Sequence, residues 1–289
     1  MPGSTGLLRA ARCVGRLFAA RKEAILRTLL AGLILCSAVA IPVTLRGGAG
    51  ASAAHRESAA ERKITAKAVH ASPTARIPVM MFHSISVRKG DPYCVPPKDF
   101  ESEMNWLHDK GYQTLSLDEV YGDLAAHAAF PARSVALTFD DGYEDNYTDA
   151  LPILRRYGFC ATVFIITGDI GKPGYLSAPQ ILAMERSGVR AECHTVTHRH
   201  LSDLPPDTQL RELRDSRTVL EQLLGRPVNY LAYPYGDHDA ETARLAKELG
   251  YRLCFDANGG AAHMDDPRTD FPRAFGDASL SDFIGSVEG

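Results

Sequence analysis

Short apolar segments alternate with amphipathic ones from residue 77 to residue 275, and this alternation is the strongest constraint on the fold. The apolar segments have the length and β-branched content of strands, whereas the amphipathic segments have helical spacing. The predicted strands are 77–82, 113–116, 134–139, 161–166, 189–193, 229–233, 251–255 and 270–275. The predicted helices are 98–110, 117–125, 147–157, 179–187, 206–224 and 239–249. Strands separated by helices pair in parallel, and seven or eight such units in one α/β domain favour closure into a barrel.

The N-terminal region differs in composition from the rest of the chain. Six cations precede an uncharged, largely apolar run at 28–45, and they are Arg9, Arg12, Arg16, Arg21, Lys22 and Arg27. Cations on one flank indicate the cytoplasmic side, so 1–46 is predicted to be a cytoplasmic basic segment with a signal anchor or a signal peptide. We favour the anchor, with the domain outside the cytoplasm; a cleaved leader would give a secreted or periplasmic protein. Residues 47–74 are predicted to be a linker, and 75–289 the folded domain.

Composition limits the partners and the covalent structure. A net charge of −3 over 289 residues gives no indication of nucleic-acid binding. The cysteines outside the leader are Cys94, Cys160, Cys193 and Cys254. An extracytoplasmic compartment would permit a disulfide, but three of them lie in strand-like surroundings where cysteine is commonly a small buried side chain, so no bridge is predicted.

Polar residues with catalytic potential follow several of the predicted strands. Asp140 and Asp141 come directly after strand 134–139, and His194 and His198 come after strand 189–193. In parallel barrels the carboxyl ends of the strands meet on one face, so these side chains are expected to converge. The alternative for the aspartates is an exposed Asp-Asp-Gly turn.

Three of these residues have the chemistry of a catalytic metal site. Zinc binds imidazole nitrogen and carboxylate oxygen, and a catalytic site keeps one position open, which Asp141, His194 and His198 would satisfy. Asp140 would then remain free to act as a general base. Backbone N–H groups in the 233–236 turn, around Tyr235, could hold a developing oxyanion, although plain chain reversal explains that turn equally well.

Two further residues complete the predicted site. Amide cleavage requires protonation of the leaving amine, and His83, at the end of strand 77–82, is the candidate acid; the alternative is a structural histidine bonded in the core. Arg273 could keep Asp140 ionised, with an ordinary surface arginine as the alternative. His200 is interpreted as structural, and the other histidines, including His238, as solvated.

The segments 138–142 (TFDDG) and 194–198 (HTVTH) together resemble the first two motifs of the polysaccharide deacetylases, the NodB-homology or carbohydrate esterase 4 family. The resemblance covers residues 77 to about 275. It implies a distorted (β/α) barrel that removes acetyl groups from N-acetylglucosamine polymers. It also implies Asp140 as the base, a divalent metal, usually zinc, on the three ligands, and the oxyanion N–H of Tyr235.

The chain departs from many family members in its later motifs. Ala232 stands where many carry an arginine, 256–258 (DAN) replaces an Asp-Trp pair, and a clear Leu-x-His motif is missing. Segment 82–85 (FHSI) and Tyr143 are similar to a subgroup that acts on poly-β-1,6-N-acetylglucosamine of biofilm matrices, in which the early histidine is the acid.

Three functional hypotheses follow. The favoured one is a membrane-tethered, metal-dependent deacetylase of extracytoplasmic poly-β-1,6-N-acetylglucosamine. The second keeps the chemistry but takes peptidoglycan as substrate. The third, suggested by the missing late motifs, is an inactive glycan-binding module. The sequence leaves the oligomeric state open.

Overall fold

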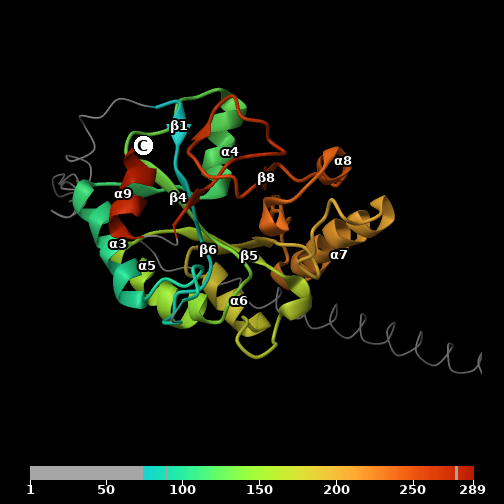
Figure 1. Ribbon diagram of the computed structural model, residues 1–289, viewed down its shortest axis with the longest axis horizontal. Coiled ribbons are helices and arrows are strands. Elements are labelled where there is room, and N and C mark those ends of the chain that lie inside the picture. Colours follow the sequence, from blue (N-terminus) through green and yellow to red (C-terminus); the bar gives the residue numbers. More distant parts are fainter. Residues whose placement is uncertain (1–73, 89, 277–278) are drawn as a thin grey trace, which may run out of the picture. The chain divides into compact units, whose positions relative to one another are not determined.

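The computed structural model describes residues 74–88, 90–276 and 279–289 (Figure 1). The predicted anchor or signal peptide at 1–46, and the predicted linker apart from its last residue, lie outside the described residues. Within the part of the chain that the structure describes, no helix is both long and apolar enough to cross a membrane.

The core of the domain is an eight-stranded sheet. Seven strands follow one another in the order β10-β2-β4-β5-β6-β7-β8, and β3 pairs with β4 beside them. They are β2 (Val79–Phe82), β3 (Gln113–Thr114), β4 (Ser134–Phe139), β5 (Ala161–Ile165), β6 (Val189–Cys193), β7 (Tyr230–Ala232), β8 (Leu253–Phe255) and β10 (Ala274–Phe275). Every pairing within this sheet is parallel, as the strand–helix alternation predicted.

The sheet closes irregularly between its two ends. A parallel bridge joins Phe255 of β8 to Phe271, and the chain then continues into β10, which pairs with β2. The N–H of Phe271 donates to the carbonyl of Cys254 over 2.8 Å, and the N–H of Asp256 donates to the carbonyl of Phe271 over 3.2 Å. These bonds close the predicted α/β fold as a distorted (β/α) barrel.

Helices surround the strands (Figure 1). The α-helices are α3 (Pro97–Lys110), α4 (Leu117–Ala126), α5 (Leu151–Tyr157), α6 (Ala178–Glu185), α7 (Pro206–Leu224), α8 (Ala240–Glu248) and α9 (Leu280–Glu288), and short helical turns are η1 (Asn146–Ala150), η2 (Thr167–Asp169) and η3 (Pro234–Gly236). Helix α4 begins where the Ser116 hydroxyl accepts from the Glu119 N–H and the Glu119 carboxylate accepts from the Ser116 N–H. This reciprocal cap satisfies donors that a helix start leaves unpaired.

Alternate strand residues face two different cores. Leu137 and Phe139 of β4 pack in the larger cluster between sheet and helices, whereas Ala136 belongs to a smaller cluster with Phe164 and Phe255 inside the barrel. Because successive side chains of a strand point to opposite faces, the inward set of β4 continues to Asp140 at the strand's carboxyl end.

The structure corrects several predicted boundaries. Strand 77–82 is interrupted by Pro78 into β1 (Arg76–Ile77) and β2, and β1 pairs instead with β9 (Ala262–His263), which was not predicted. Pro272 lacks an N–H, so regular pairing near it is confined to β10. Helix α9 was also missed, and the predicted helix 147–157 starts as the π-helical turn η1.

Candidate active site

The turn after β4 places two carboxylates at the mouth of the barrel. The N–H of Asp140 still donates to the carbonyl of Phe82 over 2.8 Å, which continues the strand ladder by one residue. Asp141 then adopts a φ of 69° and Gly142 a φ of 76°. A Cβ on Gly142 would lie 2.9 Å from a side-chain carbon of Ile165, so glycine is needed for both conformation and space. Asp140 is 3% exposed and Asp141 is 9% exposed, so the alternative of an exposed turn is wrong.

The loop after β6 supplies two imidazoles. His194 is buried directly after the strand, and four residues later His198 returns to the same cavity. Thr195 and His198 have φ values of 64° and 54°, in the left-handed region. The Thr195 hydroxyl accepts from the N–H of His198 over 3.1 Å, which folds the loop back on itself. Both rings therefore face the turn after β4.

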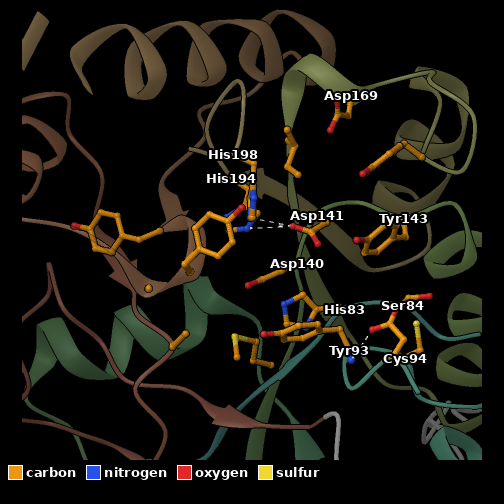
Figure 2. A pocket seen from close by; sticks show the side chains of 18 of the residues that line it. His83, Ser84, Tyr93, Cys94, Asp140, Asp141, Tyr143, Asp169, His194 and His198 are labelled. Carbon is orange, nitrogen blue, oxygen red and sulfur yellow. Dashed lines mark hydrogen bonds and ion pairs between the residues drawn. The ribbon is translucent and has the colours of Figure 1, made fainter. Parts of the chain in front are cut away.

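Asp141, His194 and His198 converge on one point (Figure 2). The Oδ1 atom of Asp141 lies 3.5 Å from Nε2 of His194 and 3.3 Å from Nε2 of His198. One ligand atom from each residue lies within 4.8 Å of the others. The structure therefore brings together the three predicted metal ligands from two strand ends.

The protonation of this group fits a cation. Nδ1 of His194 lies 2.7 Å from the carbonyl of Ala232, which can only accept, so Nδ1 carries the proton and Nε2 presents a lone pair. Burial is the largest cause that lowers the pKa of His198, to about 4, so its ring is neutral near pH 7. Asp141 Oδ1 is buried with no hydrogen-bond partner. Three convergent acceptors without a shared proton form a suitable set of ligands for a divalent metal.

Asp140 does not belong to this group, because its carboxylate is paired with Arg273. Nη1 and Nη2 of the fully buried guanidinium donate to the two carboxylate oxygens, each over 2.7 Å. Burial would raise the pKa of Asp140, but the charge and hydrogen bonds of Arg273, with smaller effects of nearby groups, act against it, and that pKa lies well below its ordinary value. The alternative of a surface arginine at 273 is therefore wrong, and Asp140 is an ionised carboxylate beside the candidate metal site.

The predicted acid and oxyanion residues line the same cleft. This cleft of about 580 Å³ is lined by His83, Asp140, Asp141, His198 and Tyr235 among others. His83 follows β2 and lies with Tyr93 on the side away from the two histidines, its ring centroid 4.8 Å from that of Tyr93 (Figure 2). Tyr235 has a φ of 60° and a side chain that is 60% exposed.

Two of the other histidines pack against aromatic rings. His200 stacks on Tyr235 with centroids 4.0 Å apart. His238 was predicted to be solvated, but it stacks on Tyr233 at 4.4 Å, with Nε2 3.6 Å from a carboxylate oxygen of Asp270. That prediction was wrong because the Asp270 carboxylate comes from a distant segment and the stacking on Tyr233 depends on the fold of the intervening turn.

An aromatic wall of the cleft was not predicted as part of the site. Tyr143 and Tyr175 stack with centroids 5.3 Å apart, and the Arg88 guanidinium lies 5.6 Å from the centroid of Tyr143. All three line the cleft. Only Tyr143 had a sequence signal, its position after Gly142; Arg88 and Tyr175 come from loops with no pattern.

Comparisons with known proteins agree with this geometry. The polysaccharide deacetylase family profile matches residues 127–254. The chain is 39% identical over 191 residues to YxkH of Bacillus subtilis (strain 168), whose name places it provisionally among the polysaccharide deacetylases; the match covers 66% of this chain and 68% of YxkH. It is 31% identical over 179 residues to the poly-β-1,6-N-acetyl-D-glucosamine N-deacetylase of Staphylococcus aureus (strain MRSA252), covering 56% of this chain and 61% of that protein.

A solved structure extends the agreement to the fold. The Streptococcus pyogenes deacetylase PplD, solved in complex with acetate, superposes with a TM-score of 0.70 at 32% identity, covering 75% of this chain and all 100% of that one. By sequence, barrel architecture and convergent site residues, the chain belongs to the polysaccharide deacetylase family of carbohydrate esterase 4 hydrolases.

Proposed function

We propose that the protein hydrolyses N-acetyl groups from N-acetylglucosamine residues of an extracytoplasmic polysaccharide, with poly-β-1,6-N-acetylglucosamine favoured. The observation that carries the proposal is the convergence of Asp141, His194 and His198 beside Asp140, which is ionised and bound by none of the three. The named substrate of the staphylococcal relative supports the choice of polymer.

The metal in this proposal is zinc, held by Asp141, His194 and His198, whose nitrogen and oxygen donors suit it. When bound, zinc polarises an acetamide carbonyl and lowers the pKa of water. Three protein ligands are what a catalytic zinc site uses, since a structural site takes four.

Each remaining residue has a separate task in the proposed reaction. Asp140 accepts a proton from the attacking water, and Arg273 keeps it ionised and oriented for that purpose. The backbone N–H of Tyr235 donates to the oxyanion that forms on the acetyl carbon. His83, across the cleft, donates a proton to the nitrogen as the C–N bond breaks, so that acetate and a free amine are the products.

The proposal is tested by acetate release from defined N-acetylglucosamine oligomers. Asp140→Asn removes the base but none of the metal ligands, so release should fall by about 10²- to 10⁴-fold with zinc content unchanged. Asp207→Asn, an exposed position in α7, is the matched control and should behave as wild type. Undiminished release by Asp140→Asn would refute the assigned base.

Linkage and turnover separate the alternatives. Faster acetate release from β-1,6-linked than from β-1,4-linked oligomers supports the favoured polymer, and the reverse order supports peptidoglycan. Saccharide binding without acetate release in the presence of zinc would establish the inactive binding module. The complete set of base and ligands in one cleft is the reason we favour an enzyme.

We also propose that the N-terminal segment anchors the domain at the outer face of the membrane. The support is the sequence asymmetry between the cations at 9–27 and the apolar run at 28–45. Membrane fractionation of the full-length chain, with mass spectrometry of its N-terminus, tests this. An intact N-terminus in the membrane fraction is expected, and a mature chain beginning after residue 46 would show cleavage instead.

A further inference from the structure

We propose that Glu212 is a positioning residue that holds the loop of the two histidines in its ligand-binding conformation. Glu212 lies on α7, a helix that packs against β6, and is 6% exposed. One carboxylate oxygen accepts from the N–H groups of Val196 and Thr197, each over 2.9 Å, and the other accepts from the Thr197 hydroxyl over 2.6 Å. The inference rests on the proposed metal-dependent function.

The hydrogen bonds to the Glu212 carboxylate come from this loop. Among the described residues, every hydrogen bond that its carboxylate accepts comes from Val196 or Thr197. These two residues lie between the candidate ligands His194 and His198. The carboxylate therefore restrains the segment that sets the distance between the two histidines. Hydrogen bonds to an ionised acceptor are stronger than neutral ones, particularly where water is excluded.

The loop needs such a restraint because its conformation is unfavourable by itself. Thr195 and His198 have positive φ values without being glycine, and such residues persist only where their surroundings hold them. Glu212 accepts hydrogen bonds from the amide N–H groups of the loop. A second set of hydrogen bonds restrains the carbonyl groups of the loop.

The turn η2, which follows β5, supplies that second restraint. The N–H of Thr167 donates to the carbonyl of Thr195 over 3.1 Å, and the N–H of Gly168 donates to the carbonyl of Val196 over 2.9 Å. A Cβ on Gly168 would lie 2.5 Å from that same Val196 oxygen, which shows how closely the two segments approach. The loop is thus held between η2 and α7, with both histidines directed at Asp141.

Zinc affinity of the full-length protein tests the role of Glu212. The protein is stripped of metal and titrated with zinc against a chromophoric chelator, and its unfolding midpoint is measured without metal. Glu212→Ala should weaken zinc binding by about 10- to 100-fold, the usual effect of losing a group that orients a ligand. Glu212→Gln should rescue much of this loss, because an amide oxygen can accept from both N–H groups.

Glu221→Ala is the matched control on the same helix. Glu221 also accepts a backbone N–H, from Val228 over 3.1 Å, and an Arg217 Nε–H over 2.9 Å, but it does not touch the histidine loop. The zinc affinity of Glu221→Ala should equal that of wild type. If Glu212→Ala does not fold, Thr197→Val removes only the hydroxyl bond and should weaken zinc binding by about fivefold, the equivalent of one hydrogen bond.

The outcomes distinguish this inference from the function on which it rests. Glu212→Ala with a lowered unfolding midpoint but wild-type zinc affinity would make Glu212 merely structural and overturn the inference, as would wild-type affinity in Thr197→Val where the alanine variant fails to fold. Wild-type protein that binds no zinc would overturn the proposed function together with the inference. Weakened zinc binding in Glu212→Ala, with much of it restored in Glu212→Gln and wild-type affinity in Glu221→Ala, supports the positioning role.

Discussion

Replacement of Arg273 by methionine should destabilise the domain strongly. The guanidinium is fully buried, and two of its N–H groups donate to Asp140 over 2.7 Å. A third donates to the carbonyl of Asp256 over 2.9 Å. Methionine fills a similar length but leaves the Asp140 carboxylate as a buried charge without its partner.

The expected loss follows from the burial of both partners. Breaking a buried ion pair from one side costs about 3–5 kcal/mol, whereas an exposed pair contributes about 1 kcal/mol or less. Domains of this size are stable by about 5–15 kcal/mol, so Arg273→Met should still fold with a much reduced margin. The double variant Arg273→Met with Asp140→Asn removes the buried charge as well. Its free energy of unfolding should therefore be lowered by no more than that of the less stable single variant.

The assay is a double-mutant cycle by chemical denaturation, with a metal chelator in every buffer. A coupling energy of about 2 kcal/mol or more between positions 140 and 273 is expected. Losses that add to within about 0.5 kcal/mol would refute the reasoning, because independent sites behave that way. The cycle measures the pair directly and does not depend on activity.

The pH dependence of stability provides a second check on the same pair. Burial would raise the pKa of Asp140, but Arg273 lowers it, so the stabilisation is present above the ordinary carboxyl pKa and is lost as the pH falls through the folded-state pKa. In Arg273→Met the largest effect that opposes burial is gone, so burial raises the pKa of Asp140, and acidification protonates the carboxyl and stabilises the folded state. The difference in free energy of unfolding between wild type and Arg273→Met should therefore decrease as the pH is lowered. An increase in that difference would contradict the assigned ion pair between Asp140 and Arg273.

Three other substitutions test different parts of the molecule. His83→Asn should lower kcat for acetate release by about 10²- to 10⁴-fold with unchanged zinc content; an unchanged kcat would assign the acid elsewhere. His198→Ala removes a ligand atom, so zinc content should fall. Added zinc should restore acetate release by chelator-treated wild type but not by the variant. Leu220→Ala, on the buried face of α7, should lower the free energy of unfolding by about 2–5 kcal/mol with zinc binding retained, and lost zinc binding would contradict the separation of core and site.

The architecture and the convergence of the candidate metal ligands could be predicted because their signals are local. A buried strand has a run of apolar residues and a helix has a period, so β4, β6 and α7 were predicted with their observed bounds. Asp141, His194 and His198 directly follow or lie near such strands, and parallel topology alone brings strand ends to one face.

Other features depend on contacts between distant segments. Arg273 was predicted as a partner of Asp140, but its burial was not, since a lone arginine after a proline has no periodicity. Glu212 lies on a helix with many charged residues, and the backbone amides that it binds leave no trace in the sequence. Positive φ at Asp141 and His198 was likewise invisible, because residues other than glycine rarely adopt it.

The ion pair at the base of the cleft joins residues 133 positions apart in the chain. During synthesis the ribosome therefore produces the carboxylate long before its guanidinium, and a nascent chain ending before Arg273 has no buried cation for Asp140. In such a chain the carboxylate must stay hydrated or take up a proton, so the mouth of the barrel cannot be completed. The Asp140–Arg273 pair therefore cannot form until the chain around β10 is in place beside β2.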